Sequence, residues 1–155
     1  MANQLPADPT QRFFEHPPVG AVFELGSFAL TQDSIIDFAR QYDPPDMHVE
    51  PVLAATGPFG EVIASGWQTI SLMMRLFVAN FLPKNGLAAP GIDELRWPRP
   101  TRPGDTLRVE CVVEKVVPSR SRPERGMVTM RCETLNQRDE AAQVMVTSLV
   151  VPRRP

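Results

Sequence analysis

The segment 67–82 is almost wholly apolar, and from Leu72 onward it contains only Arg75 and Asn80 as polar residues. Its length and the Pro83 that follows it predict a helix that ends just before this proline. A helix that is apolar on all sides must be covered on several of them. It is too short to cross a membrane and carries a charge in the middle. The rest of the chain therefore has to supply the cover.

Four strand-like segments follow this helix, rich in β-branched residues and separated by turn signals. In two of them apolar and polar residues alternate, which is typical of antiparallel strands with one covered face. Another strand is expected at Val22–Leu30. We therefore predict an α+β fold, in which a curved antiparallel sheet of about five strands wraps one long buried central helix. The four segments are Ile92–Trp97, Thr106–Val117, Met127–Leu135 and Ala141–Val151.

The N-terminal part of the chain is organised differently. Residues 1–21 are rich in proline and show no periodicity, so we expect an irregular arm, followed by a single domain over 22–155. Thr31 is a candidate N-cap for a helix that runs to Tyr42. The sequence Asp43-Pro44-Pro45 ends this helix, because a residue before proline is pushed out of the helical region.

Composition excludes several classes of protein. A formal net charge of −2 argues against a protein that binds nucleic acid by neutralising phosphates. The first residues are polar, with no signal peptide, so we predict a cytoplasmic protein without membrane association. Cys111 and Cys132 lie in two strand-like segments, and we expect small core residues rather than a disulfide or a nucleophile. No metal site is expected, because one isolated histidine among scattered acids does not make a ligand set.

A candidate acid–base pair precedes the apolar helix. Asp43 and His48 lie five residues apart on a segment that two prolines keep extended, and imidazole titrates near neutral pH. Ser65 and Gly66 open the helix, whose N-terminus offers backbone N–H groups to a developing negative charge. The alternatives are helix C-capping or turn chemistry for Asp43, a structural role for His48, an N-cap at Ser65 and a packing glycine at Gly66. Together these features indicate an enzyme that acts on an activated carbonyl.

Three segments, FARQYDPPDMHVEP (38–51), FGEVIASGW (59–67) and RPGDTL (102–107), resemble the MaoC-like dehydratases. This is the hot-dog-fold family that contains the R-specific enoyl-CoA hydratases. The resemblance covers most of the chain after about Val22, and the Asp-x4-His block is its most specific part. It implies a hot-dog domain over 22–155.

The resemblance also implies a reaction, the reversible addition of water to a trans-2-enoyl thioester of coenzyme A or a carrier protein. The chain would be a hydro-lyase of fatty acid metabolism, similar to R-specific enoyl-CoA hydratases. Asp43 and His48 would share one water, and the Gly66 N–H would bond the thioester oxygen as an oxyanion donor. Coenzyme A would enter as part of the substrate, and no separate cofactor is implied.

Further residues are candidates for substrate binding. Family members usually carry Asn two residues after the Asp, where this chain has Pro45, and often His before the Gly, where it has Ser65. Asp46 is a candidate substitute for the missing Asn. The arginine-rich region 96–131 can supply cations for the coenzyme A phosphates, or be a solvated sheet face. The substrate-binding candidates are Ser65, Trp67, Phe59 and Asp46, and the phosphate candidates are Arg96, Arg99 and Arg102, or alternatively Arg120, Arg122 and Arg125.

Two other functions are weighed against this one. A hot-dog thioesterase predicts a carboxylate on the central helix, and the segment 67–82 has none. A non-catalytic or partner-dependent subunit that binds acyl thioesters is favoured by Pro45 and opposed by the presence of Asp43 and His48. In every case we expect a homodimer or higher homo-oligomer, because a small curved sheet leaves long free edges.

Overall fold

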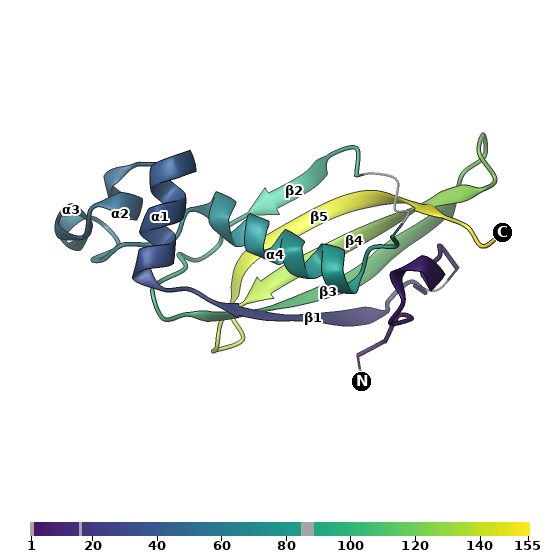
Figure 1. The fold of residues 1–155 in the computed structure, drawn as a ribbon, viewed down its shortest axis with the longest axis horizontal. Helices are drawn as coiled ribbons and strands as arrows, with labels where there is room; N and C mark the ends of the chain where they lie inside the picture. The colour runs from purple at the N-terminus through teal and green to yellow at the C-terminus, as the bar shows by residue number, and fades with distance from the viewer. Residues whose placement is uncertain (1, 16, 85–88) are drawn as a thin grey trace.

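The computed structural model describes residues 2–15, 17–84 and 89–155. Five strands form one antiparallel sheet in the order β1-β3-β4-β5-β2, and helix α4 lies lengthwise across one face of it (Figure 1). Within the described residues this sheet is not closed, and β1 and β2 are its edges. The elements are η1 (Pro9–Gln11), β1 (Val22–Ala29), α1 (Gln32–Tyr42), α2 (Asp46–Val49), α3 (Pro51–Thr56), α4 (Gly66–Asn80), β2 (Ile92–Arg96), β3 (Thr106–Pro118), β4 (Arg125–Leu135) and β5 (Ala141–Pro152).

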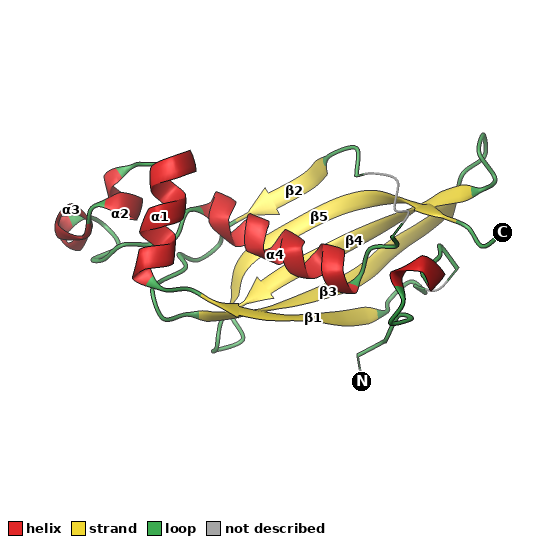
Figure 2. Ribbon diagram, in the orientation of Figure 1, coloured by secondary structure: helices red, strands yellow, loops and turns green. Residues whose placement is uncertain are grey.

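The three shorter helices α1, α2 and α3 gather beyond one end of the sheet, and the N-terminal end of α4 points toward them (Figure 2). The C-terminus and the 3-10 helix η1 of the N-terminal region lie toward the opposite end. The predicted α+β architecture, with one long helix on a five-stranded antiparallel sheet, is confirmed.

The sheet and α4 meet through alternate residues of the long strands. Leu107 and Val109 of β3 are buried, whereas Arg108 and Glu110, which alternate with them, reach the other face and pair with each other. In β1 the alternation shifts at Gly26, whose φ of 104° lies in a region that glycine adopts readily. The predicted one-sided burial of the strands is confirmed, and the shift in β1 is an irregularity that the simple alternation did not predict.

Helix α4 begins one residue earlier and ends two residues before the predicted Leu82. Its buried side chains include Ile70, Met73 and Phe77, which face the sheet. Trp67 and Val78 on the same helix are more than half exposed. The expectation that this helix is buried on several sides is therefore wrong for the single chain, because one sheet layer can cover only one of its sides.

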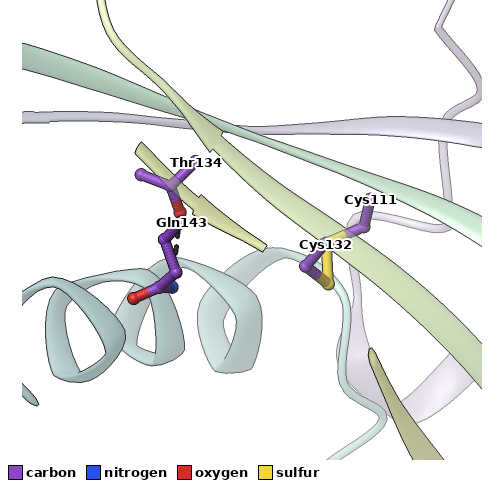
Figure 3. Close-up of a disulfide and its surroundings, with 4 residues drawn as sticks. All are labelled: Cys111, Cys132, Thr134 and Gln143. Atoms are coloured by element: carbon purple, nitrogen blue, oxygen red, sulfur yellow. Dashed lines mark hydrogen bonds between the residues drawn. A yellow bond between two sulfur atoms is a disulfide. The ribbon is translucent and has the colours of Figure 1, made fainter. Parts of the chain in front are cut away.

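Cys111 and Cys132 form a disulfide, which we call the core disulfide (Figure 3). The expectation that they would remain unbonded core residues is wrong, although both are fully buried. The reason lies in the register between β3 and β4, which places the two residues directly opposite each other with their Cα atoms 4.1 Å apart.

The N-terminal arm packs against the end of the molecule that holds the C-terminus. Arg12 is buried, and its guanidinium donates to the carbonyl oxygens of Ala79 and Leu82, where the last turn of α4 leaves carbonyls free. Burial lowers the pKa of Arg12. Phe14 is buried against Gly126 at the start of β4. These contacts hold the arm against the rest of the chain. The division into an arm over 1–21 and a domain over 22–155 stays a prediction.

In the part of the chain that the structure describes, none of the helices combines the length and the apolar character needed to span a membrane.

Candidate active site

Asp43 is the C-cap of α1, and its backbone N–H donates to the Ala39 carbonyl at 2.8 Å. Pro44 follows it directly, so the chain leaves the helix at this point and the Asp43 side chain projects from the helix end. This side chain is 29% exposed. Helix α1 thus holds the carboxylate at the end of the sheet where α4 begins.

His48 lies on the single-turn helix α2 and is 4% exposed. Its Nδ1 lies 2.7 Å from the carbonyl oxygen of Ile63. Because a carbonyl can only accept, Nδ1 carries a proton, and in the neutral ring Nε2 is free to accept one. Nε2 lies 3.6 Å from Oδ2 of Asp43.

Helix α2 is the element that brings these two side chains together, and the sequence analysis did not predict it. Pro45 is extended, as expected, but the turn begins immediately afterwards at Asp46. A carboxylate in a first helical turn after a proline is a known start signal and could have been used to find it. The turn folds the five-residue separation back on itself, so that His48 faces Asp43.

Ser65 is the N-cap of α4 and is completely buried. Its Oγ donates to Oδ2 of Asp43 at 2.7 Å and accepts from the Trp67 backbone N–H at 3.1 Å. The N-cap alternative for Ser65 is thus confirmed. Its hydroxyl is directed at the carboxylate, so it orients Asp43 and joins α1 to the start of α4.

Gly66 is the first residue of α4, at the positive end of the helix dipole. A Cβ at this position would lie 2.3 Å from Cε2 of Trp97. Glycine is therefore required for the close approach of the Trp97 indole, and the packing alternative for Gly66 is supported along with its place at the helix N-terminus.

A pocket of about 380 Å³ lies between the start of α4, helix α2 and the loop after β2. It brings together six of the predicted site residues: Asp43, His48, Phe59, Gly66, Trp67 and Arg99. The rest of its lining among the described residues is Met47, Ile63, Ala64, Thr69, Trp97, Pro98, Pro100 and Thr101.

Several predicted residues lie away from this lining. Asp46 is exposed on α2, and Arg96 pairs with Glu94 on β2. Arg102 pairs with Glu61 and donates to the Phe59 carbonyl at 3.1 Å, so it braces the loop that carries Phe59.

The two arginine clusters that the sequence left as alternatives are far apart. Arg99 lies at the pocket, where its side chain also approaches Glu140. Arg120 and Arg122 lie in the loop between β3 and β4, at the opposite end of the sheet from α1, α2 and α3, and Arg125 begins β4 there (Figure 1).

The sequence analysis missed Trp97 and Thr69 as pocket residues. The signal for Trp97 is an aromatic residue that directly follows a strand and precedes a proline-rich loop, where ligand-binding residues are often found. Thr69 gives no separate signal, since a threonine one turn into an apolar helix is ordinary.

The chain is similar to a known family model, to known protein sequences and to solved structures. The family model described as the MaoC like domain matches residues 16–136. A crystal structure of the MaoC-like dehydratase from Rhodospirillum rubrum is 42% identical, with a TM-score of 0.87 over 93% of this chain and 99% of that one. The protein YdeM of Bacillus subtilis (strain 168) is 31% identical over 122 residues, 78% of this chain and 85% of YdeM.

A third relative is the unliganded R-hydratase PhaJ1 from Pseudomonas aeruginosa, which is 26% identical. Its structure superposes with a TM-score of 0.72 over 92% of this chain and 86% of that chain. The family match over most of the chain, together with these superpositions, establishes that this protein has the hot-dog fold and belongs to the MaoC-like dehydratase family.

Proposed function

We propose that this protein is a hydratase/dehydratase that adds water reversibly to a trans-2-enoyl thioester of coenzyme A or a carrier protein. The observation that carries the proposal is the arrangement at one pocket, where Nε2 of His48 lies 3.6 Å from Oδ2 of Asp43 and Gly66 opens the adjacent helix. The names of two relatives, a MaoC-like dehydratase and an R-hydratase, support the same chemistry and the R stereochemistry.

Asp43 and His48 are suited to hold one water molecule between them. An ionised carboxylate accepts hydrogen bonds, and so does Nε2 of a neutral imidazole whose Nδ1 donates to the Ile63 carbonyl. A water that donates one proton to each of them keeps its lone pairs directed at the β-carbon of the enoyl group. As the C–O bond forms, one of the two groups takes a proton from the water, and the same group then gives this proton to the α-carbon.

The thioester oxygen gains negative charge as the water adds. The Gly66 N–H lies at the N-terminus of α4 and lines the pocket with Asp43 and His48, so it is the donor we assign to this oxygen. A single preorganised donor of this kind lowers a barrier by about 3–4 kcal/mol.

Arg99 is the cation that we assign to the coenzyme A phosphates, because it lines the pocket and is about half exposed. Arg96 and Arg102 lie outside this lining. Asp46 lies outside the pocket lining, so we do not assign to it the role of the Asn that Pro45 replaces. The polar side chain that contacts Asp43 is that of Ser65.

The alternatives keep distinct signatures. A thioesterase needs a carboxylate on the central helix, and α4 from Gly66 to Asn80 contains neither Asp nor Glu. A non-catalytic subunit that binds acyl thioesters would bind the substrate at the same pocket without turning it over.

The test is hydration of crotonyl-CoA, followed by the loss of enoyl absorbance. Asp43→Asn and His48→Ala should each lower the rate by about a hundredfold or more, as expected for acid–base groups. Asp37→Asn, which removes an exposed carboxylate from the same helix α1, is the matched control and should leave the rate unchanged. A wild-type protein that binds enoyl thioesters without hydrating them would instead identify a binding subunit.

We also propose a cytoplasmic homodimer or higher homo-oligomer. Strands β1 and β2 are the outer strands of the sheet, and Trp67 and Val78 of α4 are exposed. Light scattering coupled to size-exclusion chromatography measures the mass directly, and a monomer at micromolar concentration would contradict this expectation.

A further inference from the structure

The Trp97 indole is anchored to the interior of the molecule rather than to the loop that carries it. Its Nε1–H donates to Oε1 of Gln143 at 3.1 Å, and the same oxygen lies 2.9 Å from the hydroxyl of Thr69, which also lies 2.8 Å from the Gly66 carbonyl oxygen. Gln143 and Thr69 are both fully buried, on β5 and α4. Trp97 as a whole is 41% exposed, and the N–H edge of its indole reaches these buried side chains of the helix and the sheet.

The Gln143 amide is held in one orientation. Its Nε2 lies 3.5 Å from Oγ1 of Thr134 on the neighbouring strand, as the dashed line in Figure 3 shows. Its oxygen accepts from the Trp97 N–H, which can only donate, so rotating the amide would place a donor against a donor. The position of the indole is thus set by three elements of the core, β4, β5 and α4.

The same indole closes one side of the pocket. It lies so near Gly66 that a Cβ there would come within 2.3 Å of its ring, and it lines the pocket together with Asp43 and His48. An acyl group whose carbonyl oxygen lies at the Gly66 N–H meets this ring before it can extend between α4 and the sheet. The ring occupies the path that leads from Gly66 to Gln143.

We propose that Trp97, held by Gln143, is a specificity-determining residue that restricts the pocket to short acyl groups. This inference rests on the proposed function, since it assigns the pocket to an acyl thioester. It goes further by naming the acyl length and the side chain that sets it.

The first experiment compares kcat/KM for crotonyl-CoA and trans-2-octenoyl-CoA. The wild type should prefer crotonyl-CoA, and Trp97→Ala should raise the octenoyl-to-crotonyl ratio at least about tenfold, because the added methylenes can then enter the space that the indole occupies in the wild type. Trp97→Phe keeps a ring and should give a smaller rise. Gln143→Met removes the acceptor of the indole N–H and should also raise the ratio, although the ring itself is retained.

Val117→Ala is the control, because it removes an exposed apolar side chain of β3 that does not line the pocket. Any loss of activity in this variant should be shared by both substrates, so that the ratio stays within about twofold. A merely structural role of Trp97 would likewise change both substrates alike. The octenoyl-to-crotonyl ratio therefore distinguishes a residue that restricts acyl length from one that only packs.

A binding measurement distinguishes failure of this inference from failure of the proposed function. Calorimetric Kd values for butyryl-CoA and octanoyl-CoA, which cannot be hydrated, should show the same shift in preference in Trp97→Ala. If neither the wild type nor any variant hydrates enoyl-CoA but this shift in Kd is seen, the role of Trp97 in restricting acyl length is supported and the hydratase assignment is wrong. An unchanged ratio in both assays, or a wild type that prefers octenoyl-CoA, would contradict the proposal that Trp97 restricts acyl length. Should Trp97→Ala not fold, as judged by circular dichroism, Trp97→Leu carries the same test.

Discussion

Replacing Ser65 with alanine removes one hydroxyl that has two functions in the structure. The Ser65 Oγ accepts from the Trp67 N–H as the N-cap of α4 and donates to Oδ2 of Asp43 at 2.7 Å. Both contacts are made by a side chain with no exposed surface. Ser65→Ala should therefore lower stability and release the carboxylate that we assign to catalysis.

The magnitude follows from the two contacts taken separately. Loss of a serine N-cap costs about 1 kcal/mol. A hydrogen bond to a charged group contributes about 1.5–3 kcal/mol, and we take the lower end because the Asp43 side chain is 29% exposed and regains water. The expected loss in the free energy of unfolding is about 2.5 kcal/mol. For a chain of this size, this corresponds to a melting temperature lower by about 5–10 °C.

Urea unfolding followed by circular dichroism measures this loss, and two further variants divide it. Ser65→Gly keeps most of the capping preference, since glycine at an N-cap costs only a few tenths of a kcal/mol, and should lose about 1.5–2 kcal/mol. A double-mutant cycle of Ser65→Ala with Asp43→Ala should give a coupling of about 1.5 kcal/mol. A coupling below about 0.3 kcal/mol would refute the conclusion that Ser65 holds Asp43.

Three other predictions concern the rest of the fold. Gly126→Ala places a Cβ 2.3 Å from the Phe14 ring, so the arm should detach and limited proteolysis should cut it faster; an unchanged rate would contradict this packing. The pKa of Glu140 is lowered from its ordinary 4.5, chiefly because the Asn136 amide donates a hydrogen bond to its carboxylate. The ionised Glu140 therefore stabilises the fold fully above pH 4.5, and this contribution is lost as the pH falls through the pKa of Glu140 in the folded protein. The stability difference between wild type and Glu140→Gln in urea should thus shrink from pH 7 to about pH 3, and a constant difference would rule the effect out. Reduction of the core disulfide should lower the free energy of unfolding by about 3 kcal/mol, measured against the oxidised protein whose state is verified by mass; no change would show that the bond does not contribute.

Local rules predicted much of the fold. The Thr31 N-cap, the end of α1 before Pro44 and the apolar helix at 66–80 depend on residues within a few positions of each other. The alternation in β3 depends only on which face of the strand is covered. Each of these features depends only on residues that are close in the sequence, so the sequence was sufficient to predict them.

The site was predicted in its components but not in its connections. Asp43, His48 and Gly66 were identified from residue type and from resemblance, and the structure brings them to one pocket. The bond from Ser65 to Asp43 was not predicted, because it spans 22 positions and requires α1 and α4 to meet. Helix α2, which turns His48 back toward Asp43, was missed because a single turn has too few residues to show periodicity.

Residue order and type alone thus determined the class of fold, the family and the candidate acid–base pair, because these depend on local periodicity and on a short motif. The register of β3 against β4 decided that Cys111 and Cys132 bond. The packing of β5 under α4 decided that Gln143 reaches Trp97 across 46 positions. Only the tertiary structure could decide these pairings, because a hydrogen bond or a disulfide depends on atoms a few ångströms apart, and sequence separation does not measure that distance.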